Sequence, residues 1–90
     1  MKVKVTFSSK ANKQLKNLNL RFQDKIIDVL ERFEKGEKVD IRKLKGRKEE
    51  YRIRKGNFRV VLNRVNIREF LVTKVGAREN IYFIFIWLIL

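Results

Sequence analysis

Residues 50–62 read EYRIRKGNFRVVL, and this stretch decides the fold. Before the Gly-Asn pair, the apolar Tyr51 and Ile53 alternate with Arg52 and Arg54, which is the pattern of a strand with one buried face. After the pair, a mostly apolar run continues the strand pattern. A Gly-Asn pair between two such runs favours a tight β-turn. The stretch therefore predicts a β-hairpin with arginines on one face and apolar residues on the other.

The residues that follow extend this hairpin. We expect short strands at residues 50–55, 58–65 and 68–75, with the last two separated by a turn near Asn66. Strands joined by such short turns pair antiparallel. The second half of the chain therefore predicts a three-strand antiparallel meander.

The N-terminal part begins with a strand and a short helix. Residues 2–7 alternate between apolar and polar side chains, as a half-buried strand does. Either Ser8 or Ser9 can cap a helix, because a serine hydroxyl accepts from the free amides of the first turn. Three apolar residues then recur at helical spacing: Ala11, Leu15 and Leu18.

A second and stronger helical stripe follows, and Gly36 stands where its C-terminal cap is expected. The stripe consists of Phe22, Ile26, Val29, Leu30 and Phe33. Two helices joined so closely form a hairpin. Residues 1–90 thus predict a single α+β domain with an N-terminal strand, a two-helix hairpin and an antiparallel three-strand meander in one sheet.

Composition narrows the function. The chain has 23 Lys and Arg residues against 10 Asp and Glu, a net charge of +13, and no His or Cys. Without these two residue types we expect no zinc site, no thiol nucleophile, no metal and no cofactor. A charge of this size is usually offset by a polyanionic partner, and nucleic acid is the leading candidate. The first residues lack a signal-peptide pattern, so we expect a cytoplasmic protein that does not use a membrane.

The arginines of the hairpin face one another. If the turn is centred on Gly56-Asn57, Arg54 lies opposite Arg59, whereas a slipped turn would place Arg52 there. Like charges directly opposite on a sheet are destabilising, and a bound phosphodiester would explain them, because guanidinium groups match phosphate oxygens. Arg78 could reach the same patch. A solvated sheet face is the simpler interpretation, and composition favours neither.

Several segments in order resemble the RelE/ParE toxin superfamily of toxin–antitoxin modules. They are KLKG at residues 43–46, the hairpin at residues 51–61, VGAR at residues 75–78, and Ile81-Tyr82. The resemblance spans nearly the whole chain and favours the RelE-like branch. RelE-like members cut mRNA in the ribosomal A site, whereas ParE-like members act on DNA gyrase. Both are neutralised by a cognate antitoxin, and the complex commonly represses its own operon.

The resemblance places five residues at a RelE-type active site: Arg52, Arg54, Arg59, Arg78 and Tyr82. Arginine holds its proton too tightly for proton transfer, so Arg59 and Arg78 are expected to clamp the scissile phosphate electrostatically. Tyr82 is then the conventional candidate for moving a proton.

The chain departs from the family pattern at three positions. Arg52 and Arg54 stand where many RelE-like enzymes have lysine, and Ala77 stands where a histidine often precedes the matching arginine. A lysine crowded by cations can lose its proton near neutrality, but an arginine cannot. These departures leave open whether the chain cleaves RNA.

Two functions therefore follow from the sequence. The first is a metal-independent mRNA endonuclease that acts on translated mRNA at the ribosome and inhibits translation. The alternative is a non-catalytic binding protein, either a ParE-like gyrase inhibitor or an inactive toxin homologue that binds antitoxin or nucleic acid. The resemblance implies a cognate antitoxin, the ribosome and mRNA as partners, and operator DNA only through the antitoxin complex.

The last ten residues, IYFIFIWLIL, carry no charge at all. They are about half as long as the ~20 residues that span a bilayer, and such an apolar segment needs cover. One interpretation is a last core strand, which we favour up to Tyr82. Beyond it, at residues 83–90, we favour a surface that contacts the antitoxin or forms a homodimer with a second copy.

We predict that deleting residues 83–90 leaves a folded, monomeric and more soluble protein. Each Å² of apolar surface left in water costs ~25 cal/mol, so removing an interface segment should improve solubility. Circular dichroism and sedimentation of the truncated chain check this. Loss of the folded signal would assign the tail to the core, and an unchanged oligomeric state would exclude it as an interface.

Overall fold

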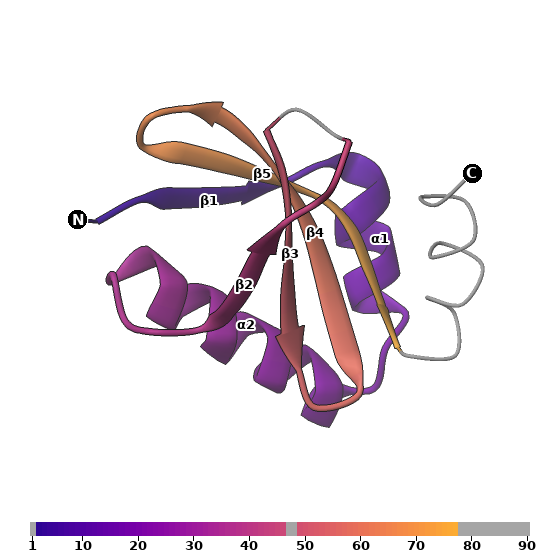
Figure 1. Ribbon diagram of the computed structural model, residues 1–90. Coiled ribbons are helices and arrows are strands. Elements are labelled where there is room, and N and C mark those ends of the chain that lie inside the picture. Colours follow the sequence, from indigo (N-terminus) through magenta and orange to yellow (C-terminus); the bar gives the residue numbers. More distant parts are fainter. Residues whose placement is uncertain (1, 47–48, 78–90) are drawn as a thin grey trace.

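The computed structural model describes residues 2–46 and 49–77, which form a five-stranded sheet and two helices (Figure 1). In chain order the elements are β1 (Lys4–Phe7), α1 (Ser9–Lys16), α2 (Leu20–Glu34), β2 (Asp40–Lys43), β3 (Glu50–Lys55), β4 (Phe58–Asn66) and β5 (Glu69–Ala77). The α+β class, the N-terminal strand and the helix pair predicted from the sequence are confirmed.

Local capping explains where the helices begin and end. Ser8 caps α1, because its hydroxyl oxygen accepts from the Ala11 amide at 3.1 Å. Asn19 caps α2 in the same way. Gly36 follows α2 with a φ of 82°, and its amide donates to the α2 backbone in a Schellman arrangement. Neither helix is long and apolar enough to cross a membrane.

The sheet is mixed and is not strictly a meander. Its strand order is β1-β5-β4-β3-β2, in which β3, β4 and β5 form the predicted antiparallel meander. β1 joins one edge in parallel with β5, and β2 joins the other edge antiparallel to β3. The sequence did not predict β2, because Ile41 is the only apolar residue among its four and no alternation is visible.

Hydrogen bonds to α2 hold β1 at its edge. The backbone amide of Val3 donates to the Glu34 carbonyl at 3.1 Å, and that of Val5 donates to Glu34 Oε2 at 2.8 Å. The amide of Lys4, on the other side of the strand, donates to the carbonyl of Arg68, directly before β5. The end of α2 therefore satisfies the outer groups of a strand that would otherwise be an open edge.

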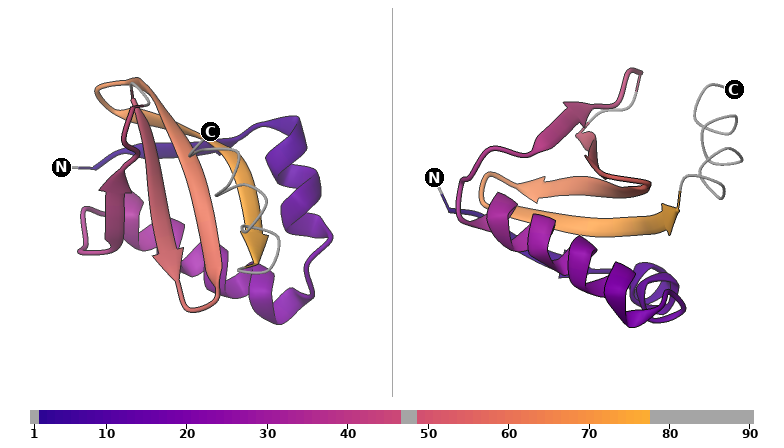
Figure 2. Two further views of the ribbon diagram at one scale, coloured as in Figure 1. Left: turned by 45° about the vertical axis from the view of Figure 1, so that its right-hand side comes forward. Right: turned by 90° about the horizontal axis from the view of Figure 1, so that it is seen from below.

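Both helices cover the same face of the sheet (Figure 2). The core between them is entirely apolar, and its most buried members from the sheet are Ile53, Val60, Leu62 and Val72. Ile53 and Val60 are register partners and are 0% and 1% exposed. The hairpin predicted from residues 50–62 therefore supplies the centre of the core.

A bulge in β5 lets its two buried valines point the same way. Val61 pairs with Lys74 and Leu62 pairs with Val72, so Thr73 is an extra residue between them. Because of this shift, Val72 and Val75 both reach the core although they are three residues apart. The Val75 amide donates to Gln14 Oε1 of α1 at 2.8 Å, which ties the bulged strand to the helix.

We predict that Ile53→Ala lowers the free energy of unfolding by about 3 kcal/mol, since truncating a fully buried Ile or Leu costs ~2–5 kcal/mol. Ile67→Ala is the matched control, because Ile67 is 64% exposed in the β4–β5 turn and should lose less than ~0.5 kcal/mol. Urea unfolding followed by circular dichroism measures both. Equal losses would show that the core is not centred on the hairpin.

Candidate functional site

A row of polar positions crosses the sheet on the face opposite the helices. Strand register aligns Asp40 of β2 with Arg54 of β3, Arg54 with Arg59 of β4, and Arg59 with Gly76 of β5. Residues paired in this way share a face, so Arg54 lies between a carboxylate and a second guanidinium. Gly76 ends the row without a side chain.

A second row lies beside the first, two residues away along each strand. It runs from Arg42 of β2 through Arg52 of β3 and Val61 of β4 to Lys74 of β5. Arg42 therefore faces Arg52 across the β2–β3 pair. The two rows together gather four guanidinium groups on one side of the sheet.

The register decides between the two turns that the sequence allowed. Gly56 has a φ of 57°, a conformation that favours glycine, and the turn is centred on Gly56-Asn57. Arg54 is therefore the residue opposite Arg59, and Arg52 lies opposite Val61. All three arginines are half-buried, so this face of the sheet is only partly exposed to solvent at the cluster.

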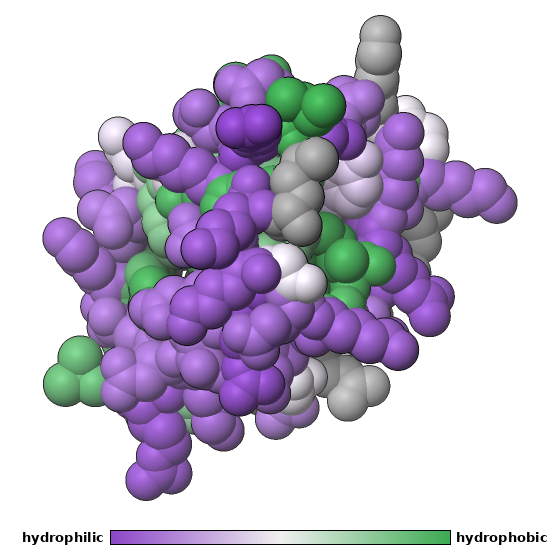
Figure 3. All heavy atoms as spheres, turned by 90° about the vertical axis from the view of Figure 1, so that its left-hand side faces the viewer, coloured by the Kyte–Doolittle hydropathy of each residue, from purple (hydrophilic) through white to green (hydrophobic). Residues whose placement is uncertain are grey.

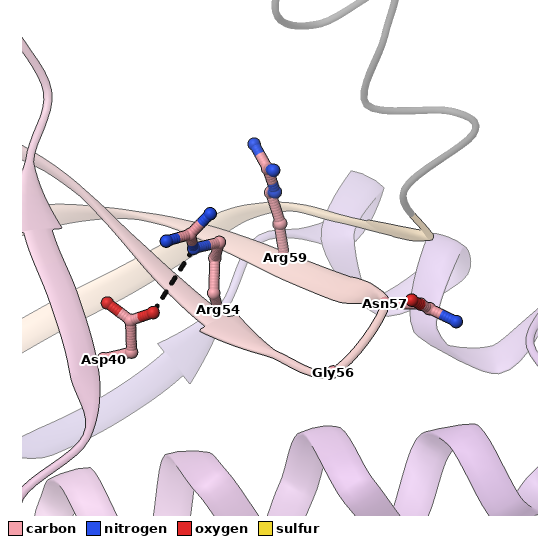
Figure 4. Close-up of a pocket in the computed structure, with 5 residues that line it drawn as sticks. All are labelled: Asp40, Arg54, Gly56, Asn57 and Arg59. Carbon is pink, nitrogen blue, oxygen red and sulfur yellow. Dashed lines mark hydrogen bonds and ion pairs between the residues drawn. The ribbon is translucent and has the colours of Figure 1, made fainter.

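A pocket of about 300 Å³ lies beside the first row, next to the β3–β4 turn (Figure 4). It is lined by Asp40, Arg54, Gly56, Asn57 and Arg59. Arg54 and Arg59 project to the same side of the hairpin, and Arg54 Nε donates to Asp40 Oδ2 at 3.3 Å. Asp40 was missed by the sequence analysis because strand β2 was not foreseen.

Arg52 occupies the most unfavourable electrostatic position of the cluster. Burial lowers the pKa of its guanidinium, and the charges of Arg54 and Arg59 lower it further, whereas Asp40 acts in the opposite direction. Its Nε is buried and has no hydrogen-bond partner in the described part of the chain. The folded protein therefore holds a partly desolvated cation that an added anion would stabilise.

The arrangement is suited to binding an oxyanion. Guanidinium groups present paired N–H donors that match the oxygens of a phosphate, and partial burial strengthens such contacts. Proton transfer is not available from these arginines, because they stay protonated at all physiological pH values. Within residues 2–46 and 49–77, no group of three acidic side chains could hold a metal ion.

Comparison with solved structures identifies the family. The sequence matches no family model and no curated protein. The structure superposes on a chain of the RelB–RelE antitoxin–toxin complex from Methanococcus jannaschii with a TM-score of 0.74 and 30% sequence identity, covering 89% of this chain and 98% of that one. The chain belongs to the RelE/ParE toxin superfamily.

Two further RelE structures have the same fold. A chain of the archaeal RelE–RelB complex from Pyrococcus horikoshii OT3 is 26% identical, with a TM-score of 0.68 over 87% of this chain and 97% of that one. The isolated Escherichia coli RelE toxin is 21% identical, with a TM-score of 0.70 over 96% of this chain and 97% of that one. The expected superfamily is therefore confirmed.

The structure brings together three of the five residues that the family resemblance singled out. Arg52, Arg54 and Arg59 lie on adjacent strands of the helix-free face. Arg78 and Tyr82 lie outside the described residues, as does the apolar segment at residues 83–90, so their predicted places in the site stay predictions.

Tyr51 belongs to the core, as expected from its shared face with Ile53. Its ring packs edge-on against Phe70, with centroids 5.7 Å apart, and Phe70 packs in turn against Phe33. These three rings contribute to a second pocket of about 500 Å³ near the end of α2. Tyr51 is therefore not a base-stacking residue of the arginine cluster.

We predict that Arg52→Met raises the free energy of unfolding by about 0.5 kcal/mol, a typical gain from relieving surface-charge repulsion. The lowered pKa of Arg52 means that folding disfavours its charged form. The free-energy cost of holding this charge is present below the pKa that Arg52 has in the folded protein. It is relieved only as the pH rises through that pKa. The gain should therefore be the same at about pH 6 and about pH 8.

Lys55→Met is the matched control, since Lys55 is exposed at the end of the same strand and its loss changes the net charge equally. Thermal melting at low salt compares the two variants. A larger gain from Lys55→Met would show that overall charge, and not the position of Arg52, limits stability.

Proposed function

We propose that the chain is the toxin of a toxin–antitoxin module and that it cleaves translated mRNA at the ribosome. The observation that carries this proposal is the row in which Arg54 and Arg59, both half-buried, face each other across the hairpin beside a pocket. A domain that had only to fold would gain nothing from this repulsion. A phosphodiester between the two guanidinium groups removes it.

The charge of the whole chain supports a polyanionic ligand. The net charge is +13, and hydrophilic side chains cover most of the surface in Figure 3. Such a field attracts RNA at long range and speeds its encounter with the protein. The arginine rows then supply the short-range contacts that place one phosphate.

The proposed chemistry uses the RNA's own 2'-hydroxyl as the nucleophile. Its oxygen attacks the adjacent phosphorus, the bond to the 5'-oxygen breaks, and the products carry a 2',3'-cyclic phosphate and a 5'-hydroxyl. Arg54 and Arg59 stabilise the charge that develops on the phosphorane oxygens. In this proposal Arg78 joins the clamp and Tyr82 moves a proton.

The partners follow from the family. The solved relatives include a RelB–RelE antitoxin–toxin complex, and we propose a cognate antitoxin for this chain as well. In a cell the free toxin would act in the cytoplasm on ribosomes and mRNA, and operator DNA would be bound only through the antitoxin complex. The apolar segment at residues 83–90 is proposed as a contact with the antitoxin or with a second copy.

A binding-only function is the second candidate, and one observation favours it. Arg52 and Arg54 cannot accept a proton at neutral pH, and Ala77 stands where relatives often have a histidine. A protein in which positions 52, 54 and 77 accept no proton can still bind RNA, antitoxin or gyrase. Mapping mRNA ends by primer extension separates the two functions.

We predict that inducing the chain produces new mRNA ends within translated regions and that Arg59→Ala reduces this cleavage about a hundredfold, as losing one group that stabilises a transition state does. Primer extension on a translated message measures the ends. The variant should stay within ~0.5 kcal/mol of the parent in stability, since exposed and half-exposed charges contribute little.

Arg21→Ala is the control, because Arg21 is exposed on α2 and its loss changes the net charge equally. Growth arrest without new mRNA ends, together with inhibited DNA supercoiling, would replace the endonuclease by the gyrase inhibitor. A strongly destabilised Arg59→Ala variant would make Arg59 a structural residue.

A further inference from the structure

Among the described residues, Asp40 is the one whose carboxylate lines the pocket of the arginine cluster. It stands on β2, an edge strand of four residues, directly opposite Arg54. Its Oδ2 accepts from Arg54 Nε at 3.3 Å, and Asp40, Arg54 and Arg59 line the same pocket (Figure 4). Arg54 therefore has an anion on one side and a cation on the other.

Folding stability does not account for this ion pair. The side chains of Arg54 and Asp40 are 39% and 47% exposed, and pairs this exposed contribute little to stability. A carboxylate also weakens the attraction of the cluster for an anion. Neither stability nor net charge therefore explains why Asp40 lies in the pocket. The group that Asp40 contacts is Arg54, so we expect its effect there.

Arg54 would not hold its direction by itself. Its side chain has many rotamers, and Arg59, a group of like charge, lies directly opposite it on the neighbouring strand. The bond to Asp40 pulls on the side of Arg54 that faces away from Arg59. It uses only Nε, so both terminal nitrogens of the guanidinium remain able to donate to another ligand.

We propose that Asp40 is a positioning residue, which holds Arg54 by Nε so that Nη1 and Nη2 bind the two non-bridging oxygens of an RNA phosphodiester. The proposal rests on the proposed function and deepens it by assigning the phosphate contact to one end of one guanidinium. Paired N–H donors and paired oxygens form a bidentate contact. Pre-orienting Arg54 lowers the entropy that binding would otherwise lose.

The experiment measures the affinity of the full chain for a short single-stranded RNA with 2'-O-methyl groups, which cannot be cleaved by the proposed route. Fluorescence anisotropy compares the parent with Asp40→Ala and Asp40→Asn. Asp40→Ala should bind about threefold more weakly although it adds a positive charge. Asp40→Asn should recover the affinity, because its amide oxygen can still accept from Arg54 Nε.

Asp28→Ala is the matched control for the change in charge. Asp28 forms an ion pair with Arg32, with 3.2 Å between its Oδ2 and Arg32 Nε, on the exposed surface of α2, where both side chains are 52% exposed. Removing it adds the same positive charge away from the pocket. Its affinity for the RNA should equal or slightly exceed that of the parent.

A double-mutant cycle ties the effect to Arg54. Arg54→Ala should weaken binding, and adding Asp40→Ala to it should cause no further loss, because the group that Asp40 positions is already gone. A further loss in the double variant would overturn the proposal, since Asp40 would then act through something other than Arg54.

Other outcomes overturn the proposal in distinguishable ways. If Asp40→Ala binds as tightly as Asp28→Ala, then Asp40 acts only as a counter-charge. If Asp40→Asn is as weak as Asp40→Ala, the carboxylate is needed for itself and not for holding Nε. If the parent and Arg54→Ala have the same affinity, Arg54 does not contact RNA, and the proposed function fails together with this inference.

Discussion

The register of the β3–β4 hairpin is the constraint on which the rest of the structure depends. A two-residue turn at Gly56-Asn57 sets it, and the φ of 57° at Gly56 is one that a residue with a side chain rarely adopts. The same register buries Ile53 against the helices and brings Arg54 opposite Arg59. Moving the turn back by one residue would leave Ile53 on the core face but place Arg52 opposite Arg59, so the turn decides which arginines form the site.

The two faces of the sheet have opposite energetic roles. The face under the helices is entirely apolar in its buried core, and it supplies the stability of the domain. The other face gathers Arg42, Arg52, Arg54 and Arg59 and lowers the pKa of Arg52 through burial and repulsion. The core therefore supports a charge cluster that would not assemble by itself, which is common where a site is built for a ligand.

The two strands that flank the hairpin in the sheet complete the site. β2 contributes Asp40 and Arg42 from one edge, and β5 contributes Gly76 from the other side of Arg59. β5 can do this because a bulge at Thr73 adjusts its register, and Gln14 of α1 binds the Val75 amide. The geometry of the pocket thus depends on contacts between segments that are far apart in the sequence.

The sequence alone determined the hairpin, both helices and the α+β class, because period-two alternation, helical stripes and caps such as Ser8 are local signals. It also brought Arg54 and Arg59 together under one of two possible turns. Only the tertiary structure chose that turn, added β2 and paired β1 in parallel with β5. The sequence does not single out Asp40, since a short polar edge strand has no periodicity of its own and is held by its neighbours. The residues of the site are brought together by the pairing of β2 with β3 and of β5 with β4. Packing of the whole sheet, and not local sequence, decides that pairing.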